Sequence, residues 1–312
     1  MRFVRDNQQP RLSAGSVVAV GSFDGMHTGH RTLIRHCRTS ARDGLDAVVL
    51  TFEPLPEALF RPLTPPARIT SVRQKLALFR AWGMDLVWMM RFNQALAAMP
   101  AADFVQEILV DALGVRHLVI GDDFRFGRAR EGDLGMLLES GTRFGFQVDA
   151  IEAVRENGER VSSSAIRHAL QAGDFAQAER LLGRAFTVEG RVYRGSQLGR
   201  RLGYPTANLR PAAEPCPLHG VFAVRARVLG PGAPGTWLDG VASLGWRPAV
   251  GGTDFVVEVH LFDFDQDLYG RRLEVGFVQK LRDEADFDDM DALVAQMRED
   301  ERHARRVIAA QA

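Results

Sequence analysis

The sequence predicts two domains of different class: an α/β domain built on a parallel sheet, then a small antiparallel β-barrel with a C-terminal helix. The first observation is length, because 312 residues are about twice the size of a usual single domain. The second is that short apolar runs alternate with amphipathic segments until about residue 150. The third is a change to β-rich runs, separated by Gly, Pro and Asp turns, from about residue 186. We therefore expect one domain over 1–184 and another over 185–312.

Buried strands alternate with helices in the first expected domain. Four apolar runs are typical of strands covered on both faces, and they are 17–20, 47–50, 86–89 and 117–120. Helical patterns follow at 30–42, 71–82, 102–113, 163–171 and 174–182. This alternation predicts a parallel sheet, whose ligands bind beyond the carboxyl ends of the strands.

The second expected domain has the pattern of a small antiparallel barrel. Alternating β-rich runs occupy 186–193, 220–229, 238–244, 255–262 and 272–279. A final helix is predicted over 288–309, because Met290, Leu293, Met297 and Ile308 lie broadly along one face.

Composition excludes several classes of function. The 39 basic and 39 acidic residues balance, so the sequence predicts neither a nucleic-acid surface nor a membrane-binding patch. Cys37 and Cys216 form no Cys-x-x-Cys motif, which argues against a Cys-based zinc site and suits a reducing compartment. Lys75 and Lys280, the only lysines, lie outside glycine-rich loops, which excludes a Walker-type P-loop. Without an apolar leader or spanning segment, we expect a soluble cytoplasmic protein, a monomer or weak homo-oligomer.

The first candidate site directly follows the first predicted strand. Residues 21–30 read GSFDGMHTGH and lead straight into a helix. His27 and His30 lie about one turn apart near a helix N-terminus, where free N–H groups and the helix dipole attract anions such as nucleotide phosphates. On the residues alone, an ordinary strand–turn–helix junction and half of a metal site stay open as alternatives. The candidate phosphate-binding residues are Gly21, Ser22, Phe23, Asp24, Gly25, His27 and His30.

A second candidate anion site opens a later helix. Residues 160–167 read RVSSSAIR, with Arg160 ahead of the helix and Arg167 one turn into it. Ser163 and Ser164 offer hydroxyl groups and free backbone amides at the helix N-terminus. The alternative is a serine cap beside a surface arginine. Two anion sites in one α/β domain suit a nucleotide that lies across the strand ends.

Together these motifs resemble the nucleotidylyltransferase domain of bacterial bifunctional riboflavin kinase/FMN adenylyltransferases. Further matching stretches are TFEP at 51–54, FN at 92–93 and GDDFRFG at 121–127. The resemblance implies a Rossmann-like N-terminal domain that adenylylates FMN, with His27, His30 and Arg167 as catalytic residues. It also makes Asp123 a candidate contact to the nucleotide or its metal.

The β-rich half carries a second, independent resemblance. Residues 190–208 read GRVYRGSQLGRRLGYPTAN, which resembles the riboflavin kinase signature ending in Pro-Thr-Ala-Asn. Thr206 and Asn208 carry oxygen atoms that suit Mg²⁺ as hard ligands. Without the resemblance, a flexible Gly/Arg loop between strands is an equal alternative. The candidate ATP-binding residues are Gly195, Gly199, Arg200, Gly203, Thr206 and Asn208.

Glu258 is a single carboxylate in the otherwise apolar strand 256–261. On the residues alone, an acid that points to solvent is an equally good interpretation. The resemblance to riboflavin kinases implies instead that Glu258 is the general base for the 5′-hydroxyl of riboflavin. It also implies flavin or product contacts for Arg282 and Glu284.

Three positions depart from the usual pattern of this family. Leu55 stands where Glu-Pro is usually followed by His-Pro, Ser164 replaces the commoner Thr, and Ala249 replaces a usual Thr. None removes a residue to which we assign catalysis. The change at Leu55 leaves the relative strength of the two activities open.

The resemblance thus predicts a bifunctional enzyme of FAD biosynthesis. ATP is the expected co-substrate, Mg²⁺ the expected cofactor, and riboflavin, FMN and FAD the substrates and products. Two alternatives stay open: only one domain is active, or the chain is a flavin- or nucleotide-binding sensor without turnover. A sensor has no need of a general base beside a pair of metal ligands, which argues against the second.

Overall fold

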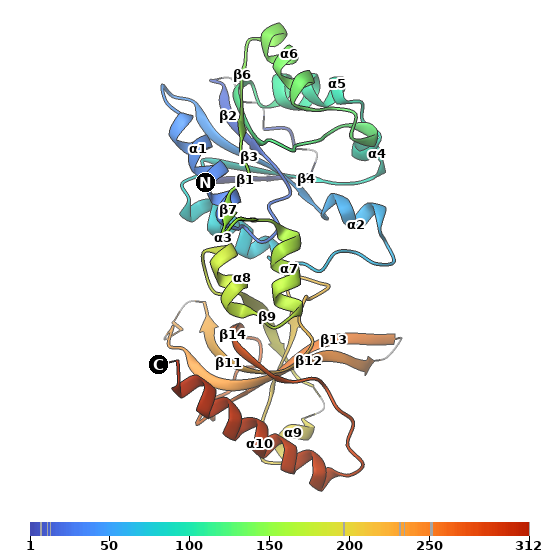
Figure 1. The fold of residues 1–312 in the computed structure, drawn as a ribbon, viewed down its shortest axis with the longest axis vertical. Helices are drawn as coiled ribbons and strands as arrows, with labels where there is room; N and C mark the ends of the chain where they lie inside the picture. The colour runs from blue at the N-terminus through green and yellow to red at the C-terminus, as the bar shows by residue number, and fades with distance from the viewer. Residues whose placement is uncertain are drawn as a thin grey trace. The chain divides into compact units, whose positions relative to one another are not determined.

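A computed structural model of the chain describes residues 1–312 apart from 7, 11, 13, 196, 231, 234, 250, 251 and 312 (Figure 1). For 198, 247–249, 252 and 253 it describes the backbone but not the side chains. The described residues form two compact units. One contains residues 1–66 and 72–163, and the other contains 67–71 and 164–312.

The first unit is built on a six-stranded parallel sheet with the strand order β1-β4-β3-β2-β5-β6. Its strands are β1 (Arg2–Arg5), β2 (Ser16–Val20), β3 (Asp46–Glu53), β4 (Leu86–Arg91), β5 (Val115–Gly121) and β6 (Gln147–Ile151). From β2 the chain adds β3 and β4 on one side, and later β5 and β6 on the other. The carboxyl ends of β2 and β5 therefore flank a topological switch point, where open α/β sheets bind ligands.

Helices cover both faces of this sheet. They are α1 (Thr28–Ser40), α2 (Pro56–Phe60), α3 (Val72–Ala81), α4 (Gln94–Ala97), α5 (Ala101–Asp103), the π-helix η1 (Phe104–Ala112), the 3₁₀ turn η2 (Arg128–Arg130) and α6 (Leu134–Phe144). All five residues of β2 are buried, so its alternating side chains enter two cores. Val17 packs with Ile34 of α1 and Phe79 of α3. Val18 packs in the opposite core, with Ile108 of η1.

The second unit contains a closed six-stranded antiparallel barrel with the strand order β10-β13-β12-β11-β14-β9. Its strands are β9 (Thr187–Tyr193), β10 (Ala207–Pro211), β11 (Gly220–Leu229), β12 (Leu238–Ala249), β13 (Gly252–Leu261) and β14 (Arg272–Arg282). Its helices are α7 (Ser163–Gln171), of which Ser163 belongs to the first unit, α8 (Phe175–Leu182), α9 (Leu198–Arg201) and α10 (Met290–Ala309). Ala304 and Ile308 of α10 pack on Ala223 of β11 and on Phe262, which ties the last helix to the barrel.

The expected architecture is confirmed: a parallel sheet in the N-terminal half, then an antiparallel barrel and a C-terminal helix. Three strands escaped the sequence patterns, namely β1, β6 and β10, and the two-residue strands β7 (Arg155–Glu156) and β8 (Glu159–Arg160) form an additional hairpin. The domain boundary expected at 184/185 stays a prediction, although α7 and α8 lie almost entirely in the second compact unit. Among the described residues, no helix is both long and apolar enough to span a membrane.

Candidate active sites

The GSFDGMHTGH loop lies at the switch point of the parallel sheet, between the end of β2 and the start of α1. Its backbone is left-handed at Phe23 (φ 50°), Gly25 (φ 84°) and Met26 (φ 47°). Glycine adopts this conformation freely, whereas each of the two larger residues is strained by about 1 kcal/mol or more. Phe23 and Met26 are 1% and 0% exposed, so burial of their side chains in the core offsets that strain. The loop is thus held in one unusual path by its own apolar residues.

His27 caps helix α1 with its side chain. Its Nδ1 accepts a hydrogen bond from the backbone N–H of His30 at 3.2 Å. In the neutral ring the proton then sits on Nε2, which makes Nε2 a donor. The His27 and His30 rings stack with their centroids 3.5 Å apart. A Cβ on Gly29 would lie 3.1 Å from Nδ1 of His27, so the glycine between the histidines makes room for this stacking.

Three further side chains fix the backbone of the loop. Lys75 Nζ donates to the carbonyl oxygen of Ser22 at 2.9 Å, and Thr51 Oγ1 donates to the same oxygen at 3.3 Å. Ser163 Oγ donates to the carbonyl oxygen of Asp24 at 2.8 Å. Ser22 and Asp24 therefore contribute backbone acceptors to the loop, and the serine-rich motif is joined to the H-x-G-H loop by a direct contact.

The remaining predicted residues of the adenylyltransferase site occupy two places. Arg160 and Asp123 pair with each other at 2.6 Å, although 123 follows β5 and 160 ends the β7–β8 hairpin. Ser164 and Arg167 belong to the second unit, where Arg167 Nε donates to the carbonyl oxygen of Ala67 at 2.6 Å. Leu55, the departure from the family pattern, is buried at 4% exposure directly before α2.

In the barrel, Glu258 lines a cavity of about 610 Å³. In the strand register, Glu258 pairs with Asn208 of β10 on one side and with Ser243 of β12 on the other. Arg282, at the end of β14, and Glu284 line the same cavity. A volume of this size is in the range of small-molecule sites.

A second cavity of about 410 Å³ adjoins the Gly/Arg loop, and Arg194, Gly195 and Arg200 line it. Thr206 and Asn208 line both cavities, so they stand between the loop and the Glu258 cavity. Asn208 Nδ2 lies 3.5 Å from Thr206 Oγ1. Two neutral oxygen-bearing side chains this close together, open to a cavity, fit a hard divalent cation such as Mg²⁺.

Gly199 and Gly203 belong to the short helix α9 and to the turn that follows it. Gly199 lines the larger cavity. Gly203 follows the short helix α9 in a left-handed turn with φ 85°. Ala249 lies among the residues whose side chains are outside the description.

Arg282 and Glu284 are both engaged within the second unit. Arg282 makes a fork with Asp300 of α10, with Nη2 and Nε lying 2.8 and 3.0–3.1 Å from the carboxylate oxygens. Glu284 accepts a hydrogen bond from Ser243 Oγ at 3.4 Å and lies 3.3 Å from His219 Nε2. The structure therefore presents Arg282 with a buried partner that the sequence did not reveal.

Sequence reasoning missed Lys75, Ser243 and Asp300. One sequence signal marked Lys75, because it is one of only two lysines in an arginine-rich chain. Its contact with Ser22 depends on how α3 packs against the loop, which the sequence does not reveal. Asp300 is only 6% exposed, but in the sequence it is one acid among several on a polar helix face. Only the folded chain distinguishes it.

Both halves of the chain match known families. Residues 9–165 match the FAD synthetase family, and residues 182–308 match the riboflavin kinase family. The bifunctional riboflavin kinase/FMN adenylyltransferase of Pseudomonas fluorescens is 45% identical, over 95% of this chain and 94% of that protein. The protein of the same name from Escherichia coli strain K12 is 43% identical, over 93% and 92%.

The chain belongs to the bifunctional riboflavin kinase/FMN adenylyltransferase family. Among solved structures, one described as a macrolide-efflux protein from Streptococcus pneumoniae has a TM-score of 0.80 and 29% identity, covering 98% of this chain and 99% of that one. That structure shares the two-domain fold of the family. The efflux in its description belongs to that protein and is not transferred here.

Proposed function

We propose that this chain makes FAD from riboflavin in two ATP-dependent steps, one in each domain. The C-terminal domain phosphorylates riboflavin to FMN, and the N-terminal domain adenylylates FMN and releases pyrophosphate. The observation that carries the proposal is that each of the two family matches covers its own domain and its own motif: the H-x-G-H loop in one, the Pro-Thr-Ala-Asn loop in the other.

For the kinase step we propose Glu258 as general base. Its carboxylate takes the proton of the riboflavin 5′-hydroxyl as that oxygen bonds to the γ-phosphorus of ATP. The bond between the γ-phosphorus and the bridging oxygen breaks, and ADP leaves. Support comes from the position of Glu258 in the larger cavity, next to Asn208 in the strand register.

We propose that Thr206 and Asn208 hold Mg²⁺ and that the Gly/Arg loop holds the ATP phosphates. When bound, the ion supplies neutralisation of the triphosphate charge. Gly195 and Arg200 line the smaller cavity, which supports a nucleotide bound there and a flavin bound in the larger cavity. Arg282, oriented by Asp300, and Glu284 then face the flavin side.

For the adenylyltransferase step we propose direct attack of an FMN phosphate oxygen on the α-phosphorus of ATP. The bond to the β-phosphate breaks and pyrophosphate leaves, so no protein nucleophile is required. His27 and His30 at the N-terminus of α1 stabilise the phosphate charge, His27 through its Nε2 donor. Arg160, the Ser163 and Ser164 amides and Arg167 hold the phosphates, and Asp123 contacts the nucleotide or its metal.

The working form we propose is a cytoplasmic monomer or weak homo-oligomer that acts on small molecules and not on nucleic acid. The balance of 39 basic and 39 acidic residues supports the exclusion of nucleic acid, because it leaves no excess positive charge for a polyanion.

The test is a time course with purified protein, riboflavin, ATP and Mg²⁺, with the flavins separated by chromatography, and a parallel reaction that starts from FMN. We expect FMN first and FAD after it, and FAD alone in the second reaction. If FMN accumulates and neither tube contains FAD, the activity is limited to the kinase. Leu55→His would then be the first variant to test for recovery of adenylylation. No conversion in either tube would favour the sensor alternative.

A further inference from the structure

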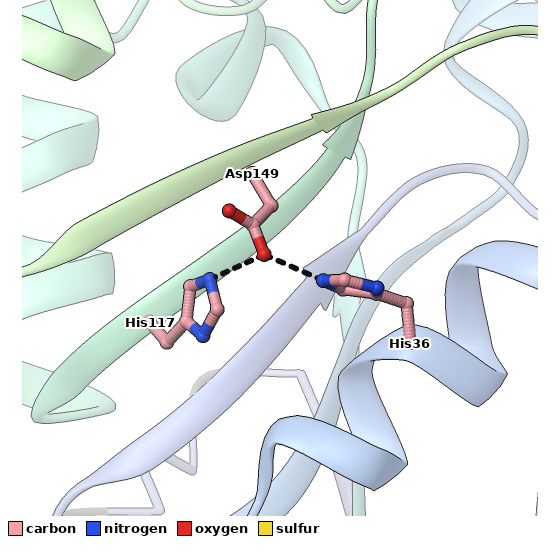
Figure 2. A group of neighbouring side chains, drawn as sticks. All are labelled: His36, His117 and Asp149. Atoms are coloured by element: carbon pink, nitrogen blue, oxygen red, sulfur yellow. Dashed lines mark hydrogen bonds and ion pairs between the residues drawn. The ribbon is translucent and has the colours of Figure 1, made fainter.

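Three metal-binding side chains meet in the first unit, away from the loop assigned to ATP. His36 of α1, His117 of β5 and Asp149 of β6 place one ligand atom each within 4.8 Å of one another. His36 Nε2 lies 2.5 Å from Asp149 Oδ2, and His117 Nε2 lies 2.8 Å from the same oxygen. Figure 2 shows the two imidazole rings flanking the carboxylate and pointing toward it.

The fold brings this group together from three separate elements. Val119 of β5 is the register partner of Asp149 on β6, and His117 lies two residues before Val119 on the same face. That face packs against α1, as the burial of Val119 with Ile34 shows. His36 stands six residues after His30, about 9 Å along the helix axis from the end of the H-x-G-H motif. The group is therefore distinct from the nucleotide site.

The nitrogen Nε2 of His117 is covered from solvent and lies 2.8 Å from Asp149 Oδ2, the same oxygen that His36 Nε2 contacts. Two imidazole nitrogens therefore converge on one carboxylate oxygen. A cation among these three atoms would have all of them as ligands.

The exposure of the group fits an ion that enters from solvent. The side chains of His36 and Asp149 are each 39% exposed, whereas that of His117 is 15% exposed. The deep histidine can thus anchor an ion while the two outer ligands leave room for water as a fourth ligand.

Ligand chemistry selects the class of ion. Two imidazoles and one carboxylate suit Zn²⁺ and neighbouring first-row divalent ions, whereas Mg²⁺ requires oxygen ligands in an octahedron. Zn²⁺ binds imidazole nitrogen at about 2.0–2.1 Å and carboxylate oxygen at about 2.0–2.2 Å, so its tetrahedral ligands lie about 3.3 Å apart. The distances of 2.5 and 2.8 Å need to open by less than about 1 Å to reach that spacing.

We propose that His36, His117 and Asp149 form a binding site for a divalent transition-metal ion, best suited to Zn²⁺ and separate from the Mg²⁺ of the reaction. The ion joins α1 to β5 and to β6, the edge strand of the sheet. Its role is structural: it fastens the helix whose N-terminus carries His27 and His30.

The test uses the full chain after chelator treatment, titrated with Zn²⁺ by calorimetry at about pH 7.5, with Mg²⁺ in a parallel titration. We expect one Zn²⁺ per chain, proton release on binding, no heat from Mg²⁺ at this site, and weaker binding at lower pH because protons compete for the imidazoles. Co²⁺ in place of Zn²⁺ should give the visible absorption of a four-coordinate ion. Zn²⁺ binding is measured without either enzymatic activity, so the result tests the metal site independently of the proposed function.

Single variants identify the ligands. His36→Gln and Asp149→Asn, which keep the size of each side chain, should each weaken Zn²⁺ binding at least about tenfold. His168→Gln, at an exposed histidine on α7, is the matched control and should bind as the wild type does. Circular dichroism of each variant checks the fold. No saturable Zn²⁺ binding by the wild-type chain, or binding that both ligand variants leave unchanged, would overturn the proposal.

Discussion

Glu258 is the residue to which we assign proton transfer in the proposed kinase step. It lies between Asn208 and Ser243 in the strand register and lines the larger cavity, which Glu284 also lines. In the sequence it could equally have pointed to solvent. In the barrel, Glu258 is half-buried and lines the larger cavity.

We predict that Glu258→Gln lowers the rate of riboflavin phosphorylation by about 10²–10⁴-fold, the usual range for loss of a general base. Adenylylation of supplied FMN should stay unchanged, because the His27 loop lies in the other unit. Separation of flavins by chromatography measures both rates. Glu274→Gln is the matched control, since Glu274 is an acid of the same barrel that pairs with Arg227 and lines neither described cavity. A near wild-type kinase rate for the first variant would remove the assignment.

At the scale of elements, the H-x-G-H loop depends on a contact from helix α3. Helix α3 carries Lys75, fully buried, to the carbonyl oxygen of Ser22. This one contact couples the placement of α3 to the conformation of a loop with two strained residues. The H-x-G-H motif therefore needs a partner element that lies about 50 residues later in the chain.

We predict that Lys75→Met destabilises the first unit by about 1–3 kcal/mol, the cost of losing a buried hydrogen bond from a charged group. It should also slow FMN adenylylation at least tenfold, on the order of 1.4 kcal/mol in the barrier, because the loop loses one of its two anchors at Ser22. The kinase rate should not change. Lys280→Met, at the other lysine of the chain, is the control for lost charge. A Lys75→Met protein with wild-type adenylylation would show that the loop keeps its conformation without Lys75, through its contacts with Thr51 and Ser163.

Two of the strands that the sequence missed, β1 and β6, share a cause. β1 and β6 are the two edge strands of the parallel sheet, and they bury only part of their side chains. A continuous apolar run is expected only where both faces and both edges of a strand are covered, as in β2.

The expected helix at 102–113 exists, but most of it is the π-helix η1, a difference that apolar periodicity does not reveal.

At the scale of the whole molecule, each unit has its own cysteine. Cys37, on α1, is buried in the core of the first unit, and Cys216 is a half-buried residue of the second unit. Burial raises the pKa of both thiols to about 12. A raised pKa keeps a thiol protonated, so both cysteines should be nearly inert to alkylation in the folded protein at about pH 8.

We predict that urea exposes the two cysteines separately. From a pKa near 9.0 in the unfolded chain and about 12 in the fold, the thiolate fraction at about pH 8 should rise roughly a thousandfold on unfolding. Riboflavin, which we assign to the barrel, should raise the urea midpoint for labelling of Cys216 and leave that of Cys37 unchanged. Pulse alkylation and mass spectrometry measure both sites in one sample. Equal shifts at both cysteines would mean that the two units unfold as one.

The sequence by itself determined the two fold classes and the two motifs that carry the chemistry. This was possible because strand and helix periodicity, and the turns of the H-x-G-H and Pro-Thr-Ala-Asn loops, depend on neighbours along the chain. Only the tertiary structure decided which distant residues meet. The contact of Lys75 with Ser22, the fork of Arg282 on Asp300, and the convergence of His36 and His117 on Asp149 depend on strand register and helix packing. No local pattern encodes those, because they are set by how separate elements bury their apolar faces together.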